Sequence, residues 1–186
     1  VHSLDLSTLT GHGVLHAKYF IVDDRSVFVG SQNWDWRALS HINELGVRIT
    51  VIPVANAFTH VFNFDWAISE GSGMRDASLA AGTLVDDFPV VIQDDRGRHE
   101  ITPVFSPRNL LPMGVRWDEA MIKQRIRAAS DSIKLQVLSY RSYPDLEKEL
   151  IAAAARGVRV SILVADWSLS EKQQHDLKNL QSASNI

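Results

Sequence analysis

The chain contains no cysteine among its 186 residues, so disulfide bonds, thiolate catalysis and cysteine-ligated zinc are excluded. It also has no apolar run near the roughly 18 to 20 residues that a membrane-spanning helix needs. An excess of positive charge is missing as well, since the chain has 19 Lys and Arg residues and 22 Asp and Glu residues. A polyanion would therefore be bound by a local group of side chains rather than by an overall basic field. No secretory signal is visible, because the sequence opens at Val1 without a basic and then apolar segment.

The composition that remains is typical of a globular protein. Hydrophobic residues make up 45% of the chain and charged residues 22%, which excludes a disordered chain. The length suits one α/β domain or pieces of two. We expect an α/β fold in which helices flank a mixed β-sheet on both faces.

The first part of the chain predicts a β-hairpin followed by a strand and a helix. Two apolar runs, Leu15–Val22 and Val27–Val29, are joined by the polar turn Asp23–Ser26. Alternating apolar residues predict a strand over Leu45–Val51, and apolar residues at helical spacing predict a helix over Val54–Ile68.

The rest of the chain predicts a linker and then a βαβ unit. Gly, Ser, Ala and Asp dominate from Ser69 to Pro89 without a clear period, and we assign residues 69–100 to a linker or loop. This separates a hairpin-bearing half, residues 1–68, from a second half, residues 101–186. The second half predicts these elements: helix Ala120–Ala129, strand Ile133–Leu138, helix Leu146–Arg156 closed by Gly157, strand Val158–Val164 and helix Ser170–Leu180.

Four side chains of the hairpin form the chemically significant group. Residues two apart on a strand share a face, so His16 and Lys18 project together. A two-residue or four-residue turn pairs positions whose numbers sum to 49, which places Lys18 opposite Ser31 and His16 opposite Asn33. An imidazole, an ammonium, a hydroxyl and a carboxamide then meet at one end of the hairpin. This combination predicts a phosphate site at which the imidazole attacks phosphorus or transfers protons.

The spacing of these residues resembles that of a known superfamily. The pattern is His16-x-Lys18-x4-Asp23-x6-Gly30-Ser31-x-Asn33. It resembles the HKD motif of the phospholipase D superfamily and matches it at every motif position. A wider likeness, through Asp35-Trp36-Arg37, Glu44-Leu45-Gly46-Val47, Arg156-Gly157-Val158 and Asp166-Trp167-Ser168, is similar to the lysosomal phospholipase-D-like 5′ exonucleases.

The resemblance implies a two-step phosphodiester transfer that uses neither metal nor other cofactor. His16 would form a phosphohistidine or protonate the leaving oxygen, while Lys18 and Asn33 hold the phosphoryl oxygens. Ser31 would add a hydrogen bond to the phosphate. Glu44 matches the carboxylate that orients the histidine ring in this family.

Other residues receive structural or weaker assignments. Asp23 and Gly30 belong to the motif, and Asp23 has a structural role because it lies at the turn with the opposite strand parity from Lys18. Tyr140 and Trp167 follow the two parallel strands, where ligands bind in such units, and are candidates for a substrate pocket. Trp34 and Trp36 fit base stacking or core packing. No His or carboxylate near His16 is spaced for metal ligation.

The sequence departs from the family pattern in having one HKD motif instead of two. The other histidines lack a Lys two residues later: His2, His12, His41, His60, His99 and His175. We therefore interpret the chain as an internal fragment that joins the back of one repeat to the front of the next. Alternatively, it is a permuted single repeat that dimerises to supply the second histidine.

Three functional hypotheses follow. The leading one is a nuclease for single-stranded nucleic acid, on the basis of the resemblance and the aromatic residues. The second is hydrolysis or transfer of phospholipid headgroups. The third is a catalytically silent half-site that binds phosphate, and the missing second motif is its support.

Overall fold

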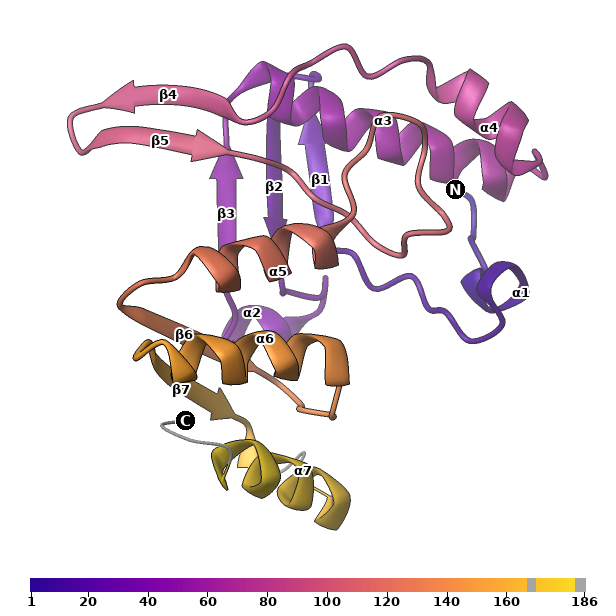
Figure 1. The fold of residues 1–186 in the computed structure, drawn as a ribbon. Coiled ribbons are helices and arrows are strands. Elements are labelled where there is room, and N and C mark those ends of the chain that lie inside the picture. Colours follow the sequence, from indigo (N-terminus) through magenta and orange to yellow (C-terminus); the bar gives the residue numbers. More distant parts are fainter. Residues whose placement is uncertain (167–169, 183–186) are drawn as a thin grey trace. The chain divides into compact units, whose positions relative to one another are not determined.

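The computed structural model describes residues 1–166 and 170–182 and divides into two compact units, Val1–Trp117 and Asp118–Ile186 (Figure 1). The elements of the first unit are α1 Leu6–Thr10, β1 Tyr19–Val22, β2 Ser26–Gly30, α2 Trp36–Ser40, β3 Gly46–Ile49, α3 Ile52–Ser69, α4 Met74–Ala81, β4 Val90–Asp94 and β5 Gly97–Ile101. Those of the second are α5 Asp118–Ala128, β6 Ser132–Val137, α6 Pro144–Ala155, β7 Arg159–Val164 and α7 Glu171–Ser182. No helix within the described residues is both long and apolar enough to cross a membrane.

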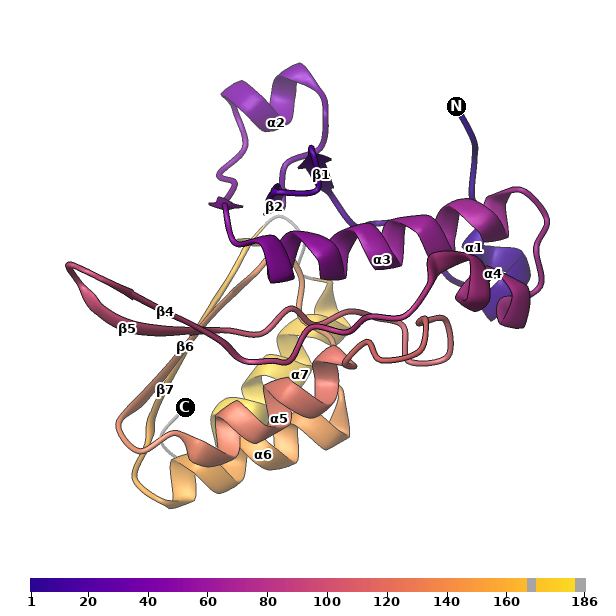
Figure 2. The same cartoon turned by 90° about the horizontal axis from the view of Figure 1, so that it is seen from above.

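Strands β1, β2 and β3 form an antiparallel sheet whose one face is covered by α3. The sheet order is β1-β2-β3, and Figure 2 shows α3 running along one side of the strands with α2 on the other. Val27 of β2 packs against Val54 and Phe58 of α3, and all three are buried. Residues of odd number along β1 and β2, such as Tyr19 and Ile21, point to this core. Residues of even number therefore point to the opposite face.

The hairpin turn sets a register different from the expected one. Tyr19 pairs with Val29 and Val22 with Ser26, so paired numbers sum to 48 rather than 49. The loop holds three residues, and Arg25 N–H donates to the Val22 carbonyl at 3.1 Å. Asp23 and Asp24 have φ values of 54° and 53°, which short polar side chains tolerate. An odd loop length shifts the register by one residue, and this is why the expected pairing of Lys18 with Ser31 was wrong.

The region predicted to be a linker is folded. Helix α4, strand β4 and most of strand β5 lie within residues 69–100, and the two units divide at Trp117 instead. Buried Ala77 of α4 joins Phe64 and Ile68 of α3 in one cluster. Ala77 and Ala81, two of the small residues that suggested a linker, thus pack α4 against α3.

The second unit is the predicted βαβ unit with flanking helices. Strands β6 and β7 pair in parallel, from Ser132 with Arg159 to Val137 with Val164. After α6 the chain turns at Gly157, whose φ of 91° and N–H bond to the Ala154 carbonyl end the helix. The α/β class is confirmed, although the described strands form three separate sheets rather than one mixed sheet.

Candidate active site

The ends of the three strands of the first sheet bring the motif residues together. Gly30 N–H donates to the Lys18 carbonyl at 3.1 Å, and Ser31 N–H donates to the Leu45 carbonyl at 2.9 Å. These bonds extend the pairing of β1 with β2 and of β2 with β3 by one step. The segments before β1, after β2 and before β3 are therefore tied at the same edge.

Ser31 and Glu44 are bonded to each other. The Ser31 hydroxyl donates to the Glu44 carboxylate, and its oxygen accepts from Leu45 N–H at 3.0 Å. We expected Ser31 to bind phosphate and Glu44 to orient His16. Among the described residues no hydrogen bond joins Glu44 to His16, so those two roles stay predictions. In this structure the pair fixes the turn after β2 to the start of β3.

Gln32 adds a second tie between the same two segments, and the sequence alone did not single it out. With its amide nitrogen towards Leu45, it donates to the Leu45 carbonyl at 3.1 Å and accepts from Gly46 N–H at 3.2 Å. The tie fits because position 30 is glycine. A Cβ there would lie 2.1 Å from an atom of the Gln32 side-chain amide and 2.6 Å from the Leu45 carbonyl oxygen. The requirement for Gly30 is thus steric.

Lys18 and His16 lie just before β1, outside the strand. The Lys18 ammonium donates to the His16 carbonyl at 2.5 Å and has no carboxylate partner within the described residues. The His16 side chain is exposed, and in the described part of the chain its ring makes no hydrogen bond. The ammonium and the imidazole are thus both available to an anion at this edge.

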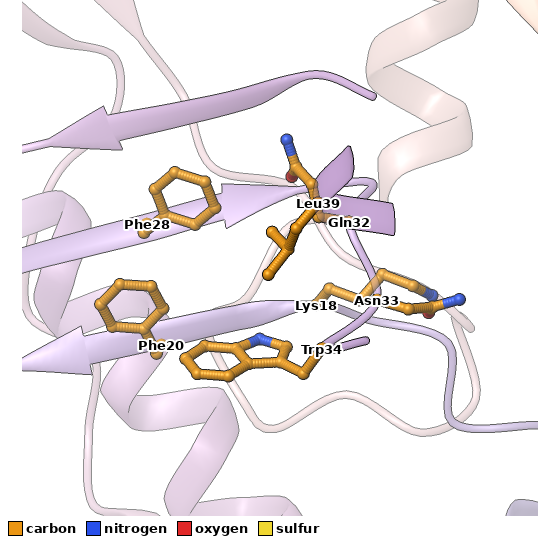
Figure 3. A pocket seen from close by; sticks show the side chains of 7 residues that line it. All are labelled: Lys18, Phe20, Phe28, Gln32, Asn33, Trp34 and Leu39. Carbon is orange, nitrogen blue, oxygen red and sulfur yellow. The ribbon is translucent and has the colours of Figure 1, made fainter. Parts of the chain in front are cut away.

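Asn33 and Lys18 line one end of a cavity of about 250 Å³ on the open face of the sheet (Figure 3). The other end is formed by the rings of Phe20 and Phe28, with Trp34 beside Phe20. Phe20 pairs directly with Phe28 across the hairpin. Phe20 and Phe28 share a face of the hairpin with Lys18, because all three have even numbers. Alternation along the strands could therefore have identified these two rings from the sequence, once the length of the turn was known.

Of the two residues expected to line a substrate pocket after the parallel strands, the structure describes Tyr140. Tyr140 is 8% exposed and packs in a cluster with Leu150 and Val160, while its hydroxyl donates to Glu147. Burial, the hydrogen bond and the nearby carboxylate all raise the pKa of its hydroxyl. Tyr140 is therefore a core residue of the second unit. Trp167 lies outside the described residues.

A half-buried carboxyl lies on the other face of the β1 segment. Asp65 of α3 lines a cavity together with Tyr19 and Trp66. Burial raises the pKa of Asp65 to about 6. No group of three or more His, Asp or Glu side chains that could hold a metal ion is present in the described part of the chain.

Comparison with known proteins shows what the part of the chain that holds this site is similar to. The family profile described as "Cardiolipin synthase, PLD-like domain" matches residues 2–66, which include every motif position. The chain is 28% identical over 196 residues to the 5′-3′ exonuclease PLD3 of Homo sapiens, covering 92% of this chain and 38% of that protein. It is 27% identical over 207 residues to a probable phospholipase D of Caenorhabditis elegans, covering 98% of this chain and 36% of that protein.

A viral protein adds a third similarity. The virion nicking-joining enzyme of vaccinia virus is 27% identical over 184 residues, covering 91% of this chain and 43% of that protein. The chain thus spans about two fifths of the length of the curated relatives that it matches. The HKD spacing, the family profile over residues 2–66 and these similarities all agree with the phospholipase D superfamily.

Proposed function

We propose that this chain provides half of the active site of a phosphodiesterase that acts on single-stranded nucleic acid through a phosphohistidine intermediate. One observation carries the proposal: the Lys18 ammonium lies beside Asn33 at a cavity edge, bonded to the His16 backbone and without a carboxylate partner among the described residues. A cation beside a carboxamide suits a diester phosphate, and the imidazole expected to attack it belongs to His16, two residues before Lys18.

The chemistry would proceed in two displacements at phosphorus. A ring nitrogen of His16 forms a bond to phosphorus while the bond to the leaving oxygen breaks, and that oxygen takes a proton from an acid. Water then attacks the phosphohistidine and gives its proton to the group that acted as acid, which is now a base. The P–N bond breaks, and His16 regains its electron pair. Lys18 and Asn33 would hold the non-bridging oxygens, whose charge they can offset throughout.

A second histidine is needed as the acid. The attacking and leaving atoms lie on opposite sides of phosphorus in an in-line displacement, so His16 cannot serve both. The second HKD motif would come from further polypeptide or from a second copy of this chain. A positioned acid contributes roughly 100- to 10,000-fold, so we expect the chain alone to be nearly inactive on natural diesters when monomeric.

Nucleic acid is the preferred substrate because several similar proteins are described as 5′-3′ exonucleases or as a nicking-joining enzyme. Phospholipid is the second candidate. The description of the matching family profile as cardiolipin synthase favours it.

The test is a cleavage assay across a range of protein concentrations. Single-stranded DNA, single-stranded RNA, phosphatidylglycerol vesicles and an activated aryl phosphodiester would be the substrates. We expect cleavage of the single strands to rise with the square of concentration if two copies combine, and the aryl diester to be cleaved most readily because its leaving group needs little protonation. A phosphate ester bound covalently to His16, detected by mass spectrometry without acid, would support the first displacement.

Two histidine variants test whether cleavage depends on His16 itself. His16→Asn should abolish cleavage, whereas His175→Asn, an exposed histidine of α7, should leave it unchanged. Cleavage of vesicles but not of single strands would favour the lipid candidate. Efficient cleavage of a natural diester by a proven monomer, or retention of activity in His16→Asn, would contradict the mechanism.

A further inference from the structure

The side-chain amide of Gln32 takes the place of a peptide group at the end of the first sheet. Gln32 is half-buried, and its amide donates to the Leu45 carbonyl at 3.1 Å and accepts from Gly46 N–H at 3.2 Å. An amide can make both bonds because it carries a donor and an acceptor together. The Leu45 carbonyl also accepts from Ser31 N–H at 2.9 Å, so two successive residues of the turn hold the same point at the start of β3.

Backbone pairing alone would hold this turn less completely. The register of β2 with β3 ends at the pair Gly30 and Gly46. At the next step, Leu45 N–H donates to the Ser31 hydroxyl at 3.0 Å rather than to a backbone carbonyl. The chain therefore leaves the strand at Ser31, and beyond that residue the contact with β3 is continued by the side chain of Gln32.

Asn33, the residue expected to hold a phosphoryl oxygen, comes next in the chain. It is exposed, and within the described residues its carboxamide makes no hydrogen bond, so the backbone of the turn determines where the carboxamide lies. Figure 3 shows the side chains of Gln32 and Asn33 leaving the turn in different directions. The far side of the turn is fixed by Asp35, whose carboxylate accepts from Arg37 N–H at 2.8 Å and caps α2. Gln32 is the corresponding fixed point on the near side.

We propose that Gln32 is a positioning residue for phosphate binding, which places the Asn33 carboxamide beside Lys18 by tying the turn to Leu45 and Gly46. This rests on the proposed function and adds to it a residue whose own amide is already engaged by the backbone. Hydrogen bonds weaken steeply as their geometry departs from the optimum, and a misplacement of about 1 Å can cost about 100-fold in rate. Loss of the tie would therefore act on the phosphate through Asn33.

Two glutamine variants form a matched pair. Gln32→Met removes both hydrogen bonds while keeping nearly the same side-chain length. Gln93→Met is the control, because Gln93 is an exposed glutamine of β4 whose amide donates to the carbonyl of its neighbour Asp94 at 3.4 Å. Thermal unfolding of each variant shows whether it is folded before any other measurement is compared.

The first measurement needs no ligand. The NMR order parameter of the Asn33 backbone N–H reports whether the turn is fixed on the picosecond to nanosecond timescale. We expect a value near the roughly 0.85 of rigid backbone in the unsubstituted chain and in Gln93→Met, and a fall towards about 0.6 in Gln32→Met.

The second measurement is the affinity for inorganic phosphate, followed by NMR titration. Asn33→Ala should weaken binding by about 10- to 100-fold, the loss of one hydrogen bond to a charged group, and Gln32→Met by at least about 5-fold. If Gln32 acts through Asn33, the two changes combined should weaken binding no more than Asn33→Ala does alone. A residue that only stabilises the fold would give additive effects.

The outcomes distinguish this inference from the proposed function. An unchanged order parameter at Asn33 in Gln32→Met, additive effects of the two changes, or equal phosphate affinity of Gln32→Met and Gln93→Met would each overturn the positioning role. If His16-dependent cleavage occurs although Gln32→Met binds phosphate normally, the phosphodiesterase proposal stands and this inference fails. If the order of Asn33 and the phosphate affinity depend on Gln32 but no diester is cleaved, the inference stands and the catalytic proposal fails. Absence of phosphate binding by the unsubstituted chain would contradict both, because each needs the anion site.

Discussion

Replacing Gly30 by alanine tests whether the turn after β2 is held as closely to β3 as the structure indicates. A Cβ at position 30 would lie 2.6 Å from the Leu45 carbonyl oxygen, so the two segments must separate by at least about 0.4 Å to reach 3.0 Å. It would also displace the Gln32 amide, whose bonds to Leu45 and Gly46 would be lost. Overpacking costs about 1 to 3 kcal/mol, and a lost hydrogen bond costs about 1 kcal/mol. With two such bonds lost, these predict a loss of about 3 to 5 kcal/mol in the free energy of unfolding.

Thermal unfolding followed by circular dichroism measures this loss. At about 2 to 4 °C per kcal/mol for a chain of this size, Gly30→Ala should lower the melting temperature by about 6 to 20 °C. Gly73→Ala is the control, because no atom lies within 4 Å of a Cβ there and its φ of −67° suits alanine. Its cost should stay below about 1 kcal/mol, since Gly73 lies at the start of α4. A melting temperature of Gly30→Ala equal to or above that of Gly73→Ala would refute the steric argument.

Three further outcomes are expected. Burial raises the pKa of Asp65 from 3.8 to about 6, so the folded state binds its proton more tightly and stability falls as the pH rises from about 4 to about 6. Asp65→Asn should remove this dependence. After allowance for solvent screening, it should stabilise the protein at pH 7 by about 1 to 2 kcal/mol, as measured by urea titration. Leu150→Ala should destabilise the second unit by about 2 to 5 kcal/mol, because Leu150 is 5% exposed, whereas Leu163→Ala, at a residue 63% exposed, should cost less than about 1 kcal/mol. If Lys18 supplies the charge that metals supply in other nucleases, cleavage should survive EDTA, and activity restored only by a divalent ion would contradict this.

The sequence was informative where a local pattern determines the element. Helix α3 and the strands of the βαβ unit follow from apolar periodicity, and Gly157 marks the end of α6 as expected. The α/β class also follows from the chain itself, and the HKD spacing, which lies within the part that matches the family profile, is a property of the sequence that does not depend on packing. The short helices α1, α2 and α4 were missed, because segments of five to eight residues carry too little periodicity to predict.

Contacts between distant segments were decided only by the tertiary structure. One residue in the hairpin loop determined the register, and with it which aromatic side chains share a face with Lys18. The bond between Ser31 and Glu44 depends on the pairing of β2 with β3, which are separated by the segment that contains α2. Tyr140 became a core residue because α6 and β7 enclose it. The sequence by itself thus determined which chemical groups this protein carries, whereas packing set the directions of the side chains and the distances between them. The reason is that an apolar repeat along a helix or strand specifies which face is buried, but not which other segment packs on that face.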